Sequence, residues 1–371
     1  MLAALSSQPN TFLSPSAQCC STTTSTLQNA STPHPSHLHN MLSPRPLSRR
    51  QKISAAACAA VGKDDSAERF VDDQKSKSMT LSSILRYPVK SGRAEPLQDV
   101  TLSQEGLFGD RRFMVTRGDG TYLTQRELPR LATLDARTTK DVLHLSFPTR
   151  SFNVSVRTRG DEIMATLFGD KISLVDQGSA VGAWLDEALS GGGGGSSDGG
   201  GGGGPLAQVQ RALFNTPAYR LLRAPDAGAA MPPLRSGAGL SDLASILLIC
   251  EESLAELNRR RALDGKYTVP MGRFRPNLVV SGCGLPHAED KWVRVRIGRD
   301  AEFRVTGPCP RCTVPDVSQQ SGVRDAAGDG PMGTLKGYRS RVGAGVLFGV
   351  YLTPLNPGAR VRVGDAVMVL R

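Results

Sequence analysis

Short segments of alternating apolar and polar residues recur along most of the chain, which is the pattern of half-buried β-strands. The segments are separated by Gly, Pro, Asn or Asp, the residues that favour turns. Strands are predicted at Thr80–Tyr87, Val100–Leu102, Phe113–Thr116, Thr121–Gln125, Leu131–Ala136, Val142–Phe147, Phe152–Val156, Ile163–Leu167, Arg220–Arg223, Ile246–Cys250, Leu278–Ser281, Trp292–Ile297, Phe303–Val305, Leu347–Leu352, Arg360–Val363 and Val367–Leu370. Strands at such short spacing predict an antiparallel sheet or barrel.

Two pairs of these strands are predicted to be hairpins. Gly118-Asp119-Gly120 predicts a tight turn before Thr121–Gln125, and Gly364-Asp365 predicts a closing hairpin near the C-terminus. Helical spacing is found at Val181–Leu189, which contains Trp184, and at Glu251–Arg261. The fold class is therefore mainly β with a few helices. Cys250 ends an apolar run and is predicted to lie in the core.

Composition divides the chain further. Residues 1–63 contain no acidic residue, are rich in Ser, Thr, Pro and Ala, and have their basic residues late, as at Arg49 and Arg50. This composition is typical of an organellar transit peptide, and favours a plastid over a mitochondrion; a disordered tail on a cytoplasmic protein is the alternative. Residues 64–78 are polar and predict a linker, followed by domains at 79–225 and 226–371. No apolar run reaches the roughly 18 residues of a membrane span.

A glycine-rich segment interrupts the first domain. Residues 191–204 contain eleven glycines, broken only by Ser196, Ser197 and Asp198. No Gly-Lys-Ser/Thr follows them, so this segment is not a P-loop. We expect a flexible surface insertion with no function of its own.

Charge and cysteine content exclude two classes of protein. The net charge of +11 is partly contributed by the N-terminal segment, and aromatic residues make up only 5% of the chain, which argues against nucleic acid binding. Seven cysteines are present, and three of them fall in the first 63 residues. The remaining four, Cys250, Cys283, Cys309 and Cys312, are too few for a disulfide framework, which favours a reducing compartment.

The segment Gly307–Asp316, GPCPRCTVPD, has the most distinctive chemistry. Cys309 and Cys312 flank Pro310 and Arg311, and the prolines predict a rigid loop at a strand end. A thiol beside a fixed guanidinium is biased toward thiolate. One thiolate cannot build a closed zinc site, but it can bind a soft metal whose other ligands belong to a cofactor.

Zinc is the alternative for these cysteines. Cys283 and His287 are four residues apart and could complete a four-ligand set with Cys309 and Cys312, although their separation fits paired zinc knuckles poorly. The cysteine pair could also form a redox module of the CxxC type.

Three further segments offer groups suited to an anion. Lys90-Ser91-Gly92 follows a strand and presents an ammonium, a hydroxyl and backbone N–H groups; a solvated turn is the alternative. Asp110-Arg111-Arg112 offers a bidentate clamp, or a structural salt bridge. Arg275-Pro276-Asn277 holds a guanidinium and an amide on a rigid turn, which otherwise is a capped turn. Tyr351 is either a core ring or a hydrogen-bond donor at the site.

Taken in order, five motifs resemble one known family. YPVKS at 87–91, GDRRF at 109–113, FRPNLVVSG at 274–282, CPRC at 309–312, and LFGVY with NPG at 347–358 resemble the molybdenum-cofactor sulfurase C-terminal (MOSC) superfamily, in the plant and algal form of its amidoxime-reducing components. The resemblance covers residues 81–370. It implies an N-terminal β-barrel-like domain followed by a MOSC β-barrel domain.

The resemblance also implies a molybdopterin cofactor and its ligands. Cys312 would be the catalytic cysteine that ligates molybdenum, with Pro310 and Arg311 contacting the cofactor. Other residues that match cofactor-binding positions are Lys90, Ser91, Arg112, Ser245, Arg275, Asn277 and Tyr351, with Ser241 and Asp242 as further candidates beside Ser245. The sequence departs from animal relatives after Cys312, where it has TVPDVSQQSG, and at Ala244, where threonine is frequent.

The function implied is a molybdenum-dependent oxidoreductase acting on N-hydroxylated compounds such as amidoximes and hydroxylamines, or on nitrite. Electrons would come from cytochrome b5 and its NADH-dependent reductase, with nitrate reductase as a further partner and a monomer as the expected state. A non-catalytic cofactor carrier or sulfur-handling module is the alternative, because the superfamily includes domains attached to cysteine desulfurases. This chain has no pyridoxal-phosphate desulfurase domain.

Overall fold

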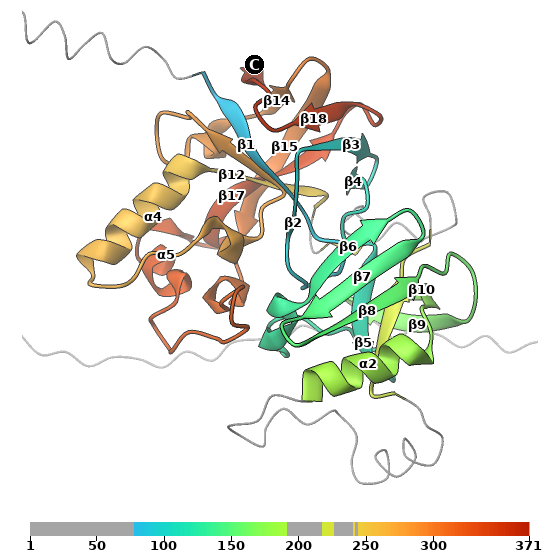
Figure 1. Ribbon diagram of the computed structural model, residues 1–371. Coiled ribbons are helices and arrows are strands. Elements are labelled where there is room, and N and C mark those ends of the chain that lie inside the picture. The colour runs from blue at the N-terminus through green and yellow to red at the C-terminus, as the bar shows by residue number, and fades with distance from the viewer. Residues whose placement is uncertain (1–77, 191–216, 226–239, 242–243, 371) are drawn as a thin grey trace, which may run out of the picture. The chain divides into compact units, whose positions relative to one another are not determined.

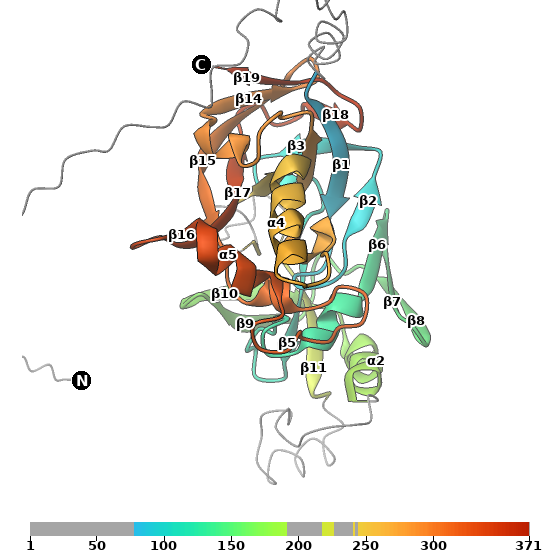
Figure 2. The same cartoon turned by 90° about the vertical axis from the view of Figure 1, so that its left-hand side faces the viewer.

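The computed structural model describes residues 78–190, 217–225, 240–241 and 244–370, and these form a mainly β protein with three α-helices (Figures 1 and 2). The predicted transit peptide, nearly all of the linker, the glycine-rich insertion and Asp242 lie outside these residues.

The described elements fall into two groups along the chain. The strands of the first part are β1 (Thr80–Arg86), β2 (Glu95–Leu97), β3 (Asp99–Ser103), β4 (Gly106–Leu107), β5 (Phe113–Arg117), β6 (Asp135–Thr139), β7 (Val142–Phe147), β8 (Arg150–Ser155), β9 (Glu162–Leu167), β10 (Asp170–Asp176) and β11 (Tyr219–Arg223), and helix α2 (Ser179–Ser190) precedes β11. The second part contains β12 (Ile246–Cys250), α4 (Glu251–Leu263), β13 (Leu278–Ser281), β14 (Arg294–Ile297), β15 (Ala301–Pro310), α5 (Pro331–Arg339), β16 (Ser340–Arg341), β17 (Gly345–Pro354), β18 (Arg360–Arg362) and β19 (Val367–Leu370).

The largest sheet has nine strands and joins the two ends of the chain. Its order is β19-β14-β15-β17-β12-β13-β1-β2, with β16 paired to β17. All described pairings in it are antiparallel except β12 with β13. The helices α4 and α5 lie next to each other against this sheet (Figure 1).

Strand β12 shows how the sheet separates two cores. Every residue of Ile246–Cys250 is buried, because successive side chains point to opposite faces and both faces are covered. Ile246, Leu248 and Cys250 belong to the core that β3, β4 and β18 complete, whereas Leu247 and Ile249 pack with α4 and α5. At Gly349 of β17 a Cβ atom would lie 2.6 Å from Ile249 Cγ1, so the LFGVY motif needs glycine there.

Smaller sheets form the rest. β5, β11, β10 and β9 make a four-stranded sheet, β6–β8 a three-stranded one, and β18, β3 and β4 another. The amphipathic helix α2 buries Val181, Trp184 and Leu185 in a core that it shares with β5 and β6–β8. None of the helices in the described part of the chain is long and apolar enough to cross a membrane.

Several predicted elements differ from the structure. Leu131–Ala136 is not one strand, because a 3-10 turn at Pro129–Thr133, which begins with proline, precedes β6. Thr121–Gln125 is not a strand and makes two isolated bridges, Thr116 to Tyr122 and Thr121 to Thr166. The chain folds back at Thr124, whose carbonyl accepts the N–H groups of Glu127 and Leu128.

The predicted closing hairpin is also wrong. The chain turns at Gly364 and Asp365, but β18 pairs with β3 and β19 pairs with β14, so the two strands join different sheets. Strands β2 and β10 and helix α5 were not predicted. The loop expected around Cys309 is instead the end of β15, which pairs with β17 as far as Pro310 with two register shifts.

Candidate cofactor site

One cavity brings together most of the predicted site residues. It has about 830 Å³ of empty space, part of it open to solvent. Eight of the ten predicted residues line it: Lys90, Ser91, Arg275, Asn277, Pro310, Arg311, Cys312 and Tyr351. Ser241 lines it too. These residues come from the chain after β1, from the turn before β13, from the end of β15 and from β17, so segments far apart in the sequence meet here.

Arg112 and Ser245 do not line this cavity. Arg112 Nη1 lies 2.7 Å from a Glu105 carboxylate oxygen, and its Nη2 donates to the carbonyls of Ala224 and Pro225. Its neighbour Arg111 faces the cavity instead, while also pairing with Asp110. Ser245 is buried directly before β12.

The cavity wall is cationic. Its lining includes Lys90 and five arginines, at positions 111, 126, 273, 275 and 311, and the described lining residues include no acidic side chain. Arg273 is neutralised by a bidentate pair with Asp325, at 2.8 and 3.1 Å. A wall of this kind favours an anionic ligand.

Tyr87 organises two of the guanidinium groups. Its ring is fully buried, with the guanidinium carbon of Arg275 at 4.3 Å and that of Arg111 at 5.0 Å from the ring centre. The hydroxyl donates to the Pro276 carbonyl at 3.0 Å. Burial raises the pKa of Tyr87 to about 12, so the ring stays neutral. Stacking on one rigid ring fixes both cations at low entropy cost.

Backbone conformation at the cavity is unusual. Ser91, Arg111 and Arg275 have positive φ values of 65°, 47° and 55°, which non-glycine residues seldom adopt. Such residues cluster at functional sites, where the surrounding structure holds them in place. For Arg275 the holding contacts include donation from its guanidinium to the Gly92 carbonyl at 2.5 Å.

Asn277 is committed to the protein. Its side-chain N–H groups donate to the Leu85 carbonyl at 3.2 Å and to Asp110 at 3.1 Å. Its side-chain oxygen accepts from the backbone N–H of Leu247 and from Arg111, both at 3.2 Å. Four hydrogen bonds are the full capacity of an amide. The geometry therefore assigns Asn277 to positioning the cavity wall.

Arg311 has a donor left over. Its Nε donates to the Phe348 carbonyl and its Nη1 to the Phe274 carbonyl, both at 3.0 Å. The Nη2 atom is buried with no hydrogen-bond partner in the described structure. A buried donor without a partner costs about 1–3 kcal/mol, and at the wall of a cavity a ligand or a water could accept from it.

The two cysteines of the motif differ. Both line the cavity, but Cys309 is 3% exposed and packs in the core beneath the helices, whereas Cys312 is exposed. The four-ligand zinc set of Cys283, His287, Cys309 and Cys312 is wrong. His287 packs its ring against Tyr338 and Phe348, and within the described residues the group that could hold a metal is instead Cys250, Glu252 and Cys283.

Comparison with known proteins adds the family. Residues 78–191 match the MOSC N-terminal beta barrel domain, and residues 237–368 match the MOSC domain. The chain is 30% identical over 314 residues to human mitochondrial amidoxime-reducing component 1, which covers 78% of this chain and 83% of that protein. The chain belongs to the MOSC-domain family. Within it, the chain is of the amidoxime-reducing-component type, as the motifs indicated.

Two further relatives show how far the similarity extends. The mouse amidoxime-reducing component 1 is 29% identical over 86% of this chain and 91% of its own length. The molybdenum cofactor sulfurase of rice is 30% identical over 78% of this chain but only 34% of its own length. This MOSC protein thus spans most of the reducing components and about a third of the sulfurase.

Some lining residues of the MOSC protein were not expected from the sequence. The cofactor contact was predicted at Arg112, but its neighbour Arg111 is the one that lines the cavity, and the motif gives no sign of which of two adjacent arginines faces inward. Thr124, in a segment interpreted as a strand, and Arg126, directly after that segment, also line the cavity, and no local pattern marks them. Tyr87 lies in the YPVKS motif, but its role beneath two guanidinium groups depends on tertiary packing.

Proposed function

We propose that this protein binds a molybdenum cofactor in the cationic cavity and reduces N-hydroxylated compounds such as amidoximes and hydroxylamines, with nitrite reduction to nitric oxide as a further activity. The observation that supports it best is the exposed Cys312 thiol on a cavity wall whose described charged residues are all cations.

The residues present fit such a group. A phosphate-bearing pterin is anionic, and the wall offers Lys90, Arg275 and the hydroxyl of Ser91. The buried Nη2 of Arg311 supplies a donor that the protein itself does not use. Cys312 would be the protein ligand to molybdenum, since thiolates suit a soft, high-valent metal.

The remaining predicted residues have supporting places in this proposal. The Pro310 backbone and Tyr351 would contact the cofactor from the wall. Asn277 would hold Arg111 and the Leu247 backbone in position. Arg112 and Ser245 would support the wall from behind, since neither lines the cavity.

The described cavity wall offers few groups for proton transfer. None of the described lining residues is Asp, Glu or His, and arginine does not release its proton in proteins. Reducing an N-hydroxylated compound to the amine and water takes up two protons, which would come from solvent at the open side of the cavity or through Lys90 or Tyr351. When bound, the cofactor would supply the electrons that break the N–O bond, two for an N-hydroxylated compound and one for nitrite.

We further propose the electron donor and the compartment. Cytochrome b5 and its NADH-dependent reductase would supply the electrons to a monomeric enzyme, as the family resemblance implies, and nitrate reductase would be a further partner. The N-terminal composition favours a plastid or mitochondrion, and the relatives named above as mitochondrial support the second.

A non-catalytic cofactor carrier or sulfur-handling module is the second candidate. The similarity to the rice molybdenum cofactor sulfurase supports it. The two candidates share the bound cofactor and differ in turnover.

Elemental analysis with matched variants tests both. Chain expressed in a host that makes the eukaryotic-type cofactor should contain about one molybdenum, and X-ray absorption should show a protein sulfur ligand. Cys312→Ala should lose that sulfur and the NADH-dependent reduction of an amidoxime through cytochrome b5, whereas Cys309→Ala, at the buried cysteine, should keep both. Molybdenum without turnover would favour the carrier, and a chain with no molybdenum would refute both.

A further inference from the structure

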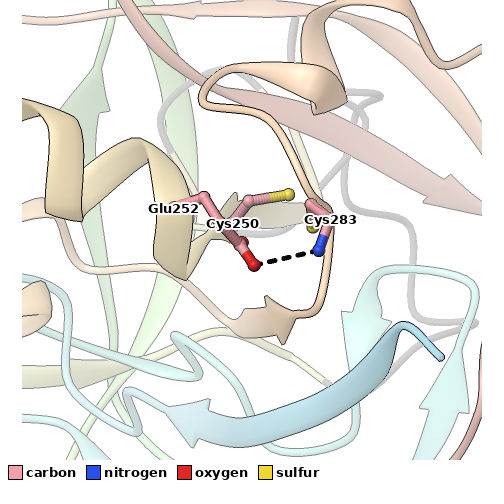
Figure 3. Close-up of side chains that lie close together, drawn as sticks. All are labelled: Cys250, Glu252 and Cys283. Atoms are coloured by element: carbon pink, nitrogen blue, oxygen red, sulfur yellow. Dashed lines mark hydrogen bonds between the residues drawn. The ribbon is translucent and has the colours of Figure 1, made fainter. Parts of the chain in front are cut away.

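A second group of cysteines lies away from the cavity. Cys250 ends strand β12, Glu252 is in the first turn of α4, and Cys283 is in the loop after β13. Figure 3 shows the three side chains converging, with the two sulfur atoms facing a common space. Their ligand atoms all lie within 4.8 Å of one another, and none of the three residues lines the cationic cavity.

The topology explains why residues so distant in sequence meet. Strands β12 and β13 are parallel neighbours, with Cys250 opposite Val280. The loop that leaves β13 therefore begins beside the start of α4. Glu252 fixes this loop, because one of its carboxylate oxygens accepts the backbone N–H groups of Gly282 at 2.8 Å and Cys283 at 3.0 Å.

The other carboxylate oxygen of Glu252 is an unexplained acceptor. Its Oε2 atom is sealed from solvent and has no hydrogen-bond partner in the described structure. Buried acceptors of this kind usually have a partner such as an ion or an ordered water. The two thiols beside it add two soft ligands to this hard one.

We propose that Cys250, Glu252 and Cys283 bind a Zn²⁺ ion. Two sulfurs and one carboxylate oxygen form a donor set that zinc accepts, at about 2.3 Å for sulfur and 2.0–2.2 Å for oxygen. Ligands of a tetrahedral ion at those lengths lie roughly 3.3–3.8 Å apart, so a limit of 4.8 Å leaves only a small adjustment. A water molecule would take the fourth position, from the side where Cys283 is half-buried.

The charges around the cluster favour a cation. Binding displaces the two thiol protons to solvent, and two thiolates with one carboxylate then face the doubly charged ion. The contact with Cys283 and burial raise the pKa of Cys250, so the ion must displace a firmly held proton. The buried Glu289 carboxyl lies beside this group and accepts the Cys250 backbone N–H at 3.3 Å. Burial raises the pKa of Glu289, and a nearby cation would favour its ionised form.

The proposed ion has a structural consequence. It would tie the end of β12 and the start of α4 to the loop after β13. These strands flank the turn that presents Arg275 and Asn277 to the cavity. Zinc here would thus stiffen the scaffold of the cofactor site without entering it.

Cobalt provides a direct test on the full-length, reduced chain. Co²⁺ added alone should bind one equivalent and give the near-ultraviolet sulfur-to-cobalt absorption and the visible bands of a tetrahedral ion, and Zn²⁺ should abolish them. Cys283→Ser should weaken Co²⁺ binding at least tenfold, as should the isosteric Glu252→Gln, which keeps the proposal testable if the cysteine variant folds poorly.

The matched control is Cys312→Ser, which removes the one cysteine classed as exposed among the described residues and should leave the cobalt spectrum unchanged. A spectrum that disappears in Cys312→Ser but persists in Cys283→Ser would overturn the proposal, as would the lack of any thiolate absorption in the reduced chain. A disulfide between Cys250 and Cys283 would also overturn the proposal if it re-formed in the reduced chain and blocked cobalt binding. Mass spectrometry would detect it as a loss of two hydrogens.

Discussion

The two cysteine pairs of this protein resemble each other in one respect and differ in another. In each pair one thiol is buried, at Cys309 and Cys250, and the other is more accessible, at Cys312 and Cys283. Around Cys312 the charged side chains of the cavity wall are cations, whereas the Cys250 pair lies beside the carboxylates of Glu252 and Glu289.

The contrast teaches that neighbouring charge selects what a thiol can hold. A cationic wall stabilises a metal that arrives within an anionic cofactor, and an anionic wall stabilises a bare cation. The residue type alone does not separate these cases. Each variant below changes the surroundings of either Cys312 or Cys250, and the unchanged group serves as its internal control.

The largest effect is expected at Arg311. Arg311 directly precedes Cys312 in sequence. Arg311→Leu removes both its positive charge and its Nη2 donor, which has no hydrogen-bond partner in the described structure. Molybdenum bound per chain should fall below about a tenth of the wild-type value, since a lost charge-assisted contact is worth at least a factor of ten. Metal analysis measures it, with Arg360→Leu, at an exposed ion pair with Asp99, as the control. Unchanged molybdenum binding would contradict the role given to the cationic cavity wall in holding the cofactor.

The next effect concerns the support of the cationic wall. Asn277→Ala deletes a buried amide with four hydrogen bonds and should lower the free energy of unfolding by about 2–3 kcal/mol. Urea denaturation gives the value. Asn258→Ala is the control, since its amide makes two bonds to Val269 in a half-buried place and should cost less. Equal losses would mean that Asn277 has no special part in the wall.

The smallest effect is a pH dependence of the stability near Cys250, Glu252 and Cys283. Burial, and then the charge of Arg339, lower the pKa of His287 to about 4. Between pH 6.5 and 4 the unfolded chain binds a proton at this residue that the folded chain does not, so stability falls as the pH falls. His287→Asn should flatten this decline, and asparagine tolerates the φ of 60° at that position.

Thermal melting at several pH values measures the slope, with His144→Asn, at a half-buried histidine of β7, as the control. Cobalt absorption should be the same in His287→Asn, because the ring lies outside the proposed ligand set. Loss of the cobalt spectrum in His287→Asn would instead indicate that His287 takes part in the proposed metal site.

Much of the fold was readable from the sequence. Period-two alternation located most strands, and Val181–Leu189 and Glu251–Arg261 fall within α2 and α4. The reason is that alternation records which face of a local segment is buried. It does not record the partner, so the strands at Arg360–Arg362 and Val367–Leu370 were expected to pair with each other and instead join β3 and β14.

The prediction of the candidate site had the same limit as the prediction of the fold. The motifs containing Lys90, Arg275 and Cys312 already indicated which kinds of side chain would meet at the site, because residue types and spacing are local properties. Only the tertiary structure decided that Arg111 rather than Arg112 faces the cavity, and that Thr124 joins its wall. It also brought Cys283 to Cys250 through the parallel pairing of β12 with β13. Contacts of that kind depend on how distant segments pack, and no local pattern encodes them.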